Sequence, residues 1–282
     1  LPDVLRDSDA DLSHQKRALD EMAAAYQDTF GFNVFPFQST FLDETARAGG
    51  HQTERVTDFY HEAAFPVVET AESADHVGVE LNFMGFLGKM EAESDENGAA
   101  RSRGFARQFL DRHLLRWLPA FLFALRDHGQ PFFVAVARLT LEVVVDHRRS
   151  LQPSDASDED RFALPDPPDI LDDPKTGLRD IAEFLLVPAH TGIFLSRNGI
   201  RSLSHRERLP AGFGSRKNML SNLLRSAANY DGLEQVTDAM VGLVDDNRTA
   251  WRAFGDSDLA VCRTVADVWC NRLDRTEQML ET

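Results

Sequence analysis

The sequence predicts an all-α protein, and three observations support this fold class. Apolar residues recur at the helical spacing i, i+3, i+4, i+7 in most stretches of the chain. Serines that could cap a helix stand before several of these stretches. Neither an internal repeat nor a β-hairpin signal interrupts the pattern. With 282 residues, the chain is long enough to bury a substantial core.

Two amphipathic helices are expected in the first third of the chain. The first should begin after Ser13, which is placed to cap it, and its apolar stripe is Leu19, Met22, Ala23 and Tyr26. The second spans 77–90, and its apolar residues cover most of its circumference, as in a helix in the middle of a bundle. These residues are Val77, Leu81, Phe83, Met84, Phe86, Leu87 and Met90.

Two further helices are predicted before residue 150. One covers 101–127, with a kink or a restart at Pro119, because proline lacks an N–H group and crowds the preceding turn. The segment 132–147 is rich in β-branched residues, which favour a strand. Its apolar spacing is helical, however, and it is long for a strand, so we predict a helix.

Residues 153–174 predict a mobile linker within the boundary segment 151–176. They hold five of the twelve prolines, and eight acidic residues against the single Arg161. Prolines remove hydrogen-bond donors, like charges repel, and few apolar groups are available for burial. The acidic, Pro-rich linker divides the chain into an N-terminal helical part, 1–150, and a C-terminal helical part, 177–282.

Five helices are expected in the C-terminal part, at about 178–186, 197–208, 216–230, 233–250 and 258–280. Ser196, Ser215 and Ser257 stand where N-caps are needed. The last helix carries the only cysteines of the chain, Cys262 and Cys270. Because they point to different sides of that helix, they cannot easily bridge, which fits a reducing compartment.

The composition excludes nucleic-acid binding and favours a cytoplasmic protein. With 46 acidic and 30 basic residues the formal net charge is −16, and no Lys/Arg stripe could neutralise phosphates. Only four of the basic residues are lysines, which fits either a halophile-like acidic surface or a GC-rich genome. We find no secretory signal at the N-terminus, and no apolar run long enough for stable membrane insertion.

The sequence carries no clear signature of a metal site, a nucleophile or a phosphate loop. No HExxH or HxxxH pair occurs among the nine histidines, two cysteines are too few for structural zinc, and no serine lies in a GxSxG elbow. The loop GFGSRKN (212–218) precedes a predicted helix but lacks the spacing of a phosphate loop. A structural loop is therefore the favoured interpretation, and its capacity to bind an anion is generic.

The pair Asp75–His76 lies at the start of the apolar helix 77–90. Adjacency alone cannot make it a catalytic dyad, because neighbouring helical residues point about 100° apart. The simplest interpretation is a helix start in which Ser73 is the cap, Asp75 favours the positive end of the helix dipole, and His76 lies on the surface. The alternative is the entrance to a binding surface.

Four segments in one order resemble a known family. They are PFQSTFLDE (36–44), VTDFYHEAAF (56–65), ADHVGVELNFMGFL (74–87) and FARQFLDRHLLRWLPAFLFAL (105–125). Together they resemble the TorD/DmsD/NarJ-type chaperones of molybdoenzyme maturation, and 216–231 is more loosely similar. In the family pattern Glu-x-x-x-Pro-x-Asp-His, Glu69 and Asp75–His76 match, whereas Ser73 stands in place of the proline.

The resemblance implies a TorD-like helical bundle and a protein that is not an enzyme. Such chaperones bind the twin-arginine signal peptide or the apo form of a molybdopterin-containing oxidoreductase of the DMSO reductase family, and they assist cofactor insertion and assembly before export. The client carries the molybdopterin cofactor. The expected partners exclude nucleic acid, and the chain is expected to be a monomer or a domain-swapped dimer.

The client-binding surface expected from the resemblance combines an apolar groove with an acidic rim. A twin-arginine peptide has a cationic end and an apolar stretch, and carboxylates bind arginine through charge-assisted hydrogen bonds. The candidate residues are Phe37, Ser39, Phe41, Tyr60, Glu69, Asp75, His76, Glu80, Phe83 and Met84. The alternatives are a GTP-binding switch that uses Asp75–His76 and the 212–218 loop, and a helical adaptor without a maturation role.

Overall fold

The computed structural model describes residues 15–66, 72–128, 130–151 and 162–281, and its first helix covers 15–26. The elements that follow are η1 (Gln27–Asn33), α2 (Gln38–Leu42), α3 (His51–Glu62), α4 (Val77–Glu93), α5 (Glu96–Phe109), η2 (Leu110–Leu114), α6 (Leu115–His128), α7 (Pro131–Ser150), α8 (Leu178–Leu185), α9 (Pro188–Thr191), α10 (Arg197–Arg206), α11 (Arg216–Asn229), α12 (Leu233–Gly255) and α13 (Ala260–Leu280), where η denotes a π-helix. Within these described ranges no sheet forms, and the all-α prediction is confirmed.

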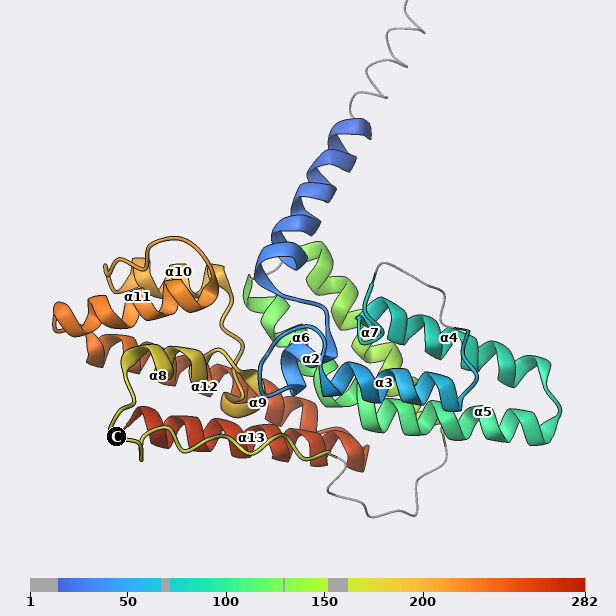
Figure 1. The fold of residues 1–282 in the computed structure, drawn as a ribbon. Helices are drawn as coiled ribbons and strands as arrows, with labels where there is room; N and C mark the ends of the chain where they lie inside the picture. The colour runs from blue at the N-terminus through green and yellow to red at the C-terminus, as the bar shows by residue number, and fades with distance from the viewer. Residues whose placement is uncertain (1–14, 67–71, 129, 152–161, 282) are drawn as a thin grey trace, which may run out of the picture.

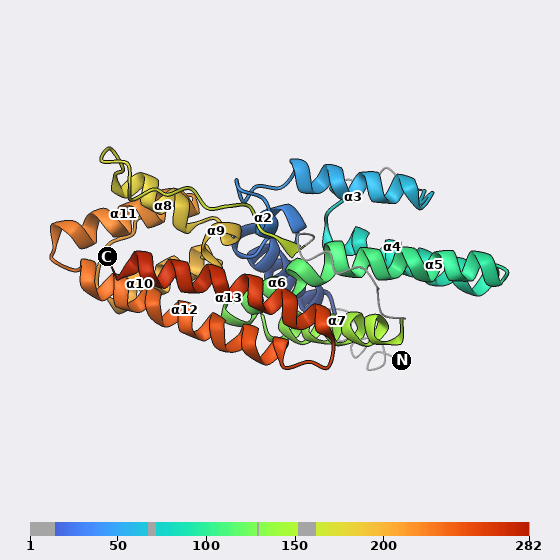
Figure 2. The same cartoon turned by 90° about the horizontal axis from the view of Figure 1, so that it is seen from below.

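The helices are arranged around α6. The antiparallel pair α4–α5 forms one end of the molecule and the pair α12–α13 lies toward the other (Figures 1 and 2). The helix over 15–26 projects away from this body (Figure 1). Over the part of the chain that the structure describes, no helix combines the length and the apolar character needed to cross a membrane.

The helix predicted over 101–127 is part of a longer helical run, 96–128. Pro119 lies inside α6, which neither ends nor restarts there. The irregular turn is instead η2, which comes just before α6. A π-helical turn has a longer spacing of backbone hydrogen bonds than an α-helix, so the irregularity of this helical run lies in η2. The segment 132–147 is helical as predicted, and α7 begins with Pro131 in its first turn, where the missing N–H has no cost.

Two of the three predicted serine caps are confirmed. Ser196 accepts a hydrogen bond from the Gly199 N–H and caps α10, and Ser215 does the same for α11. Ser257 is not the N-cap of α13, because that helix begins two residues later than the serine cap requires; its hydroxyl accepts from the Leu259 N–H at 3.2 Å. The predicted cap at Ser13 lies outside the described residues.

Residues 162–165 of the predicted linker are packed against the helices. Phe162 and Leu164 are buried, and two arginines donate to backbone carbonyls of this segment. Arg116 donates to the carbonyl of Ala163 (2.8 Å), and Arg272 donates to the carbonyl of Leu164 (3.0 Å). The prediction of a mobile linker is therefore wrong from 162 to 165, because buried guanidinium groups need acceptors and this segment provides them. Residues 152–161 lie outside the described residues.

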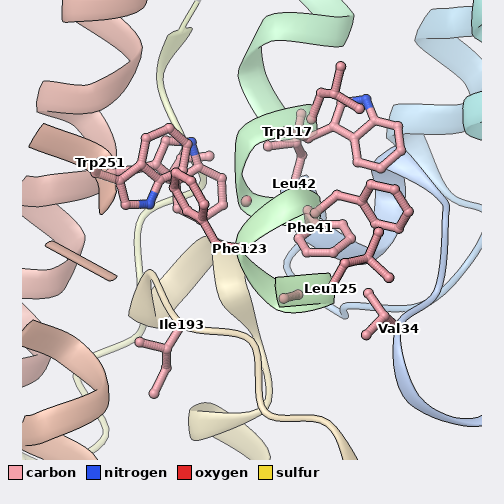
Figure 3. Close-up of a cluster of buried hydrophobic side chains, with 14 of the residues drawn as sticks. Val34, Phe41, Leu42, Trp117, Phe123, Leu125, Ile193 and Trp251 are labelled. Atoms are coloured by element: carbon pink, nitrogen blue, oxygen red, sulfur yellow. The ribbon is translucent and has the colours of Figure 1, made fainter. Parts of the chain in front are cut away.

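One hydrophobic core runs through both parts of the chain. Figure 3 shows Phe41 and Trp117 on one side of α6 and Phe123 and Trp251 on the other. Phe41 stacks on Phe194 of the C-terminal part, with ring centres 5.2 Å apart. The two parts predicted from the sequence therefore share their interior, and each completes the burial of α6.

Candidate functional site

Asp75 is fully buried and joins two segments that are far apart in the sequence. Its carboxylate accepts hydrogen bonds from the Ser39 N–H (2.9 Å) and from the Ser73 hydroxyl (2.5 Å). Its backbone carbonyl accepts from the Gln38 N–H (2.9 Å). Both N–H groups belong to the first turn of α2, where the helix itself offers no acceptor. Asp75 therefore caps α2 from another segment of the chain.

His76 is the N-cap of α4. Its Nδ1 accepts a hydrogen bond from the Gly78 N–H at 3.0 Å, and its ring meets Phe37 edge to face at 5.2 Å. Burial lowers the pKa of His76 below its ordinary value, and the carboxylates of Glu72 and Asp75 offset part of this effect. The ring is therefore neutral at pH 7, as its role as an acceptor requires.

Asp75 and His76 are thus both helix caps, and the interpretation of this pair as a helix start needs one correction. Ser73 does not cap α4; it donates to Asp75, while His76 is the cap. The two side chains serve different helices, α2 and α4, so they do not act on a common group.

Seven of the ten candidate residues are buried. They are Ser39, Phe41, Tyr60, Asp75, Glu80, Phe83 and Met84. The aromatic residues among them pack with one another in the core, as Tyr60 and Phe83 do with ring centres 4.8 Å apart, so the client-binding role of these residues stays a prediction. Phe37 and His76 remain partly exposed, and Glu69 lies outside the described residues.

Glu80 does not belong to an acidic rim. It is fully buried and accepts a hydrogen bond from the Trp117 indole N–H at 3.1 Å, while its other carboxylate oxygen has no partner among the described residues. Burial raises the pKa of Glu80 well above its ordinary value; the Trp117 hydrogen bond opposes this rise and the Asp75 charge adds to it. This carboxyl is a structural group beneath the surface.

A buried polar chain supports α2 from behind, and the sequence analysis missed it. His113 Nδ1 lies 3.2 Å from the side-chain oxygen of Gln38, whose amide donates to Gln52 at 3.2 Å. Burial and the neighbouring charges, of which Arg116 is the strongest, lower the pKa of His113 to about 3. These polar side chains satisfy one another inside the protein, as buried polar groups must.

An apolar groove of about 150 Å³ opens beside His76. It is lined by Tyr26, Phe30, Pro36, His76, Val77, Leu81, Leu118, Phe121, Leu125, Phe133, Val136, Ala137 and Thr140. At one wall, the ring centres of Tyr26 and Phe30 lie 6.0 and 4.9 Å from that of Phe133. The sequence analysis missed these aromatic residues because they belong to helical stripes that indicate packing. An apolar stripe on a helix near the ends of the chain is the signal that could have found them.

The groove continues into a wider exposed apolar surface. On α7, the side chains of Phe132, Val136, Leu139 and Val143 follow one stripe and are each 45 to 60% exposed. On the projecting helix, Leu19, Met22 and Tyr26 are exposed as well. Contiguous apolar surface of this kind marks an interaction site on a folded protein.

The loop 212–218 behaves as a helix start, as the sequence predicted. Ser215 caps α11 by accepting from the Asn218 N–H at 3.2 Å. Lys217 forms an ion pair with Glu183. Among the residues with described positions, no group of three or more His, Cys, Asp or Glu side chains could hold a metal ion.

The described part of the chain is all-α, and its candidate interaction site is the exposed apolar surface formed by the groove beside His76 and the stripe on α7. Residues 3–122 match the family model described as "Nitrate reductase delta subunit". This match over the N-terminal part supports the resemblance to the NarJ/TorD-type family of redox-enzyme maturation chaperones. Comparison with curated proteins and with solved structures gave no match.

Proposed function

We propose that the protein is a cytoplasmic, system-specific chaperone for a molybdopterin-containing oxidoreductase of the DMSO reductase family. It binds the twin-arginine signal peptide or the apo form of this enzyme and assists cofactor insertion and assembly before export. One observation carries the proposal: in a chain of this family, an apolar groove beside His76 continues into the exposed stripe of α7.

The groove fits the apolar stretch of a leader peptide. Its walls are mostly aromatic and aliphatic, and His76 supplies a polar edge beside Val77 and Leu81. Apolar grooves of this type bind peptides by burying alternate or helically spaced side chains. The apolar part of the leader would therefore lie along α7, across Val136 and toward Leu139.

The arginines of the leader need carboxylates that remain accessible. Asp75 and Glu80 are buried, so they do not fill this role. Glu72 is exposed, and its negative charge raises the pKa of His76. Because His76 forms the polar edge of the groove, the charge of Glu72 acts at this edge. The net charge of −16 also favours the approach of a cationic peptide.

Calorimetric titration with twin-arginine leader peptides tests the proposal. We expect saturable binding that weakens when the Arg-Arg pair is changed to Gln-Gln. Val136→Asp should weaken binding at least tenfold, because it places a charge in the groove. The matched control is Phe213→Asp, which changes an 89% exposed phenylalanine that does not line the groove. Equal binding by Val136→Asp and the unchanged protein would refute this site.

The two alternative functions have weaker support. The GTP-binding switch relied on Asp75, His76 and Lys217, which are engaged as two helix caps and one ion pair. A helical adaptor without a maturation role would bind the mature, cofactor-loaded enzyme as tightly as the apoenzyme. Titration with both enzyme forms separates this adaptor from a chaperone.

A further inference from the structure

A cavity of about 1040 Å³ lies between the N-terminal and the C-terminal parts. Its walls are the end of η1, the loop around 44–47, α8, α9, and the first turns of α10 and α11. This volume is at the upper end of the range of small-molecule sites, roughly 300–1,000 Å³. It is separate from the apolar groove beside His76, with which it shares no lining residue.

Three arginines line this cavity without a carboxylate partner among the described residues. Arg47, Arg197 and Arg216 come from three separate segments. Arg216 donates only to the backbone carbonyl of Leu195, at 3.1 Å, and the buried Nε of Arg197 has no hydrogen-bond partner. In a chain with 46 acidic residues, three unpaired arginines around one cavity indicate that the missing partner is an anion from outside.

Two of these guanidinium groups lie over aromatic rings. The guanidinium carbon of Arg197 lies 5.7 Å from the ring centre of Phe32, and that of Arg216 lies 4.7 Å from the ring centre of Phe194. Stacking on a ring leaves the N–H edges of a guanidinium available for an oxyanion. Desolvation lowers the pKa of Arg216 only to about 10, so this group stays cationic at neutral pH.

The carboxylates of the cavity do not neutralise these arginines. Glu183 pairs with Lys217, and Asp180 accepts a hydrogen bond from the Gly177 N–H at 2.9 Å. The remaining acid is Glu44, which is exposed on its loop. The first turns of α10 and α11, which contain Arg197 and Arg216, add the partial positive charge of two helix N-termini.

We propose that this cavity binds an organic phosphate. The phosphate groups lie against Arg197 and Arg216 at the starts of α10 and α11, and Arg47 reaches them from the opposite wall. A bare phosphate would leave most of the volume empty, so the ligand also carries a ring, which packs near Phe184. Because the walls come from both parts of the chain, the bound ligand connects them and stabilises the fold.

Calorimetry and thermal unfolding with four probes test this inference on the full chain. The probes are inorganic phosphate, pyrophosphate, and the nucleoside diphosphates ADP and GDP. We expect a nucleoside diphosphate to bind more tightly than pyrophosphate and to raise the unfolding temperature. Arg197→Gln should weaken this binding at least tenfold. The matched controls are Arg201→Gln on α10 and Arg225→Gln on α11, which change arginines of the same helices outside the cavity.

Three results would overturn the inference. They are the absence of binding by every probe, an equal loss in the control variants, and equal affinity for pyrophosphate and the nucleotides, which would exclude the ring. Arg216→Gln should weaken the binding at least tenfold as well, and if this variant does not fold, the double variant Arg47→Gln/Arg197→Gln replaces it. Leader-peptide titration reports on the separate groove, so failure of one proposal is distinguishable from failure of the other.

Discussion

Asp75 and His76 have different structural roles, and substitutions can separate them. Asp75→Ala removes the acceptor for the buried Ser39 N–H and should cost about 2–3 kcal/mol of unfolding free energy. His76→Ser keeps an N-cap acceptor for α4 but removes the ring from the groove. We expect His76→Ser to weaken leader binding while its unfolding free energy stays within about 0.5 kcal/mol.

Denaturant unfolding and calorimetry on both variants check this pair of expectations. His76→Asn, another good N-cap, is the matched control for the cap. Normal leader binding by His76→Ser would show that the ring does not contact the peptide. Unchanged stability of Asp75→Ala would show that the cap on α2 is dispensable.

Glu80 should make the stability fall as the pH rises above the ordinary glutamate pKa of 4.5. Its pKa is raised in the folded protein, so the folded state keeps a proton that the unfolded chain has lost. The contribution of Glu80 to stability therefore falls as the pH rises from the ordinary glutamate pKa of 4.5 toward the folded value. Glu80→Gln cannot lose a proton, so its unfolding free energy should fall less steeply with pH.

Urea unfolding of the unchanged protein and of Glu80→Gln between pH 6.5 and 9 compares how steeply the two unfolding free energies fall with pH. His113, whose pKa is about 3 in the folded protein, is present in both proteins, so its effect on the pH profile cancels from the comparison. Parallel pH profiles for the two proteins would show that Glu80 does not keep its proton.

At the residue scale, the sequence predicted which residues form an apolar helix better than it predicted where their side chains lie. The periodicity of 77–90 correctly indicated a helix that is apolar around most of its circumference. It could not indicate which face another helix covers, so Phe83 and Met84 were assigned to a groove although they lie in the core. The role of Asp75 was not predictable either, because α2 has five residues and is too short to leave a periodic signal.

At the element scale, a buried ion pair connects α7 to the irregular turn before α6. Arg148 donates to both carboxylate oxygens of Asp111 in η2, at 2.6 and 3.2 Å, and both side chains are buried. Arg148→Ala should cost about 3–5 kcal/mol, because it removes a buried cation that donates two hydrogen bonds to the Asp111 carboxylate.

The neighbouring Arg149 is the matched control for this ion pair. It is exposed and pairs with Asp146 and Asp258 at the surface, where solvent screens the charges, so Arg149→Ala should cost much less than Arg148→Ala. Denaturant unfolding of the two variants measures the difference. Equal costs would mean that burial does not strengthen the Arg148–Asp111 pair.

Most of the helices were predictable, whereas three were missed, and two of these are the shortest α-helices. The helix starts at α10 and α11 agree with the sequence because serine caps mark them. By contrast, α2, α3 and α9 were not predicted; two of them have five and four residues, too few for a hydrophobic period to repeat. The packing of 162–165 was also missed, because it depends on Arg116 and Arg272, which are distant in the sequence.

At the scale of the whole molecule, the shared core predicts that the N-terminal part cannot fold alone. In a fragment of residues 1–150, the side of α6 that carries Phe123 would lose Trp251, and Phe41 would lose Phe194. We expect this fragment to lack a cooperative unfolding transition by circular dichroism, whereas the full chain has one. A cooperative transition in the fragment would show that 1–150 is an independent domain.

A hydrogen bond of the Trp269 side chain to a residue distant in the sequence has a consequence for the synthesis of the protein on the ribosome. Its indole N–H donates to the carbonyl of Arg116, at 2.9 Å, across 153 positions of the chain. A ribosome must therefore release almost the entire polypeptide before α6 can be enclosed, and contacts of such long sequence separation form slowly. The interior around α6 thus stays uncovered during much of the translation of this chain.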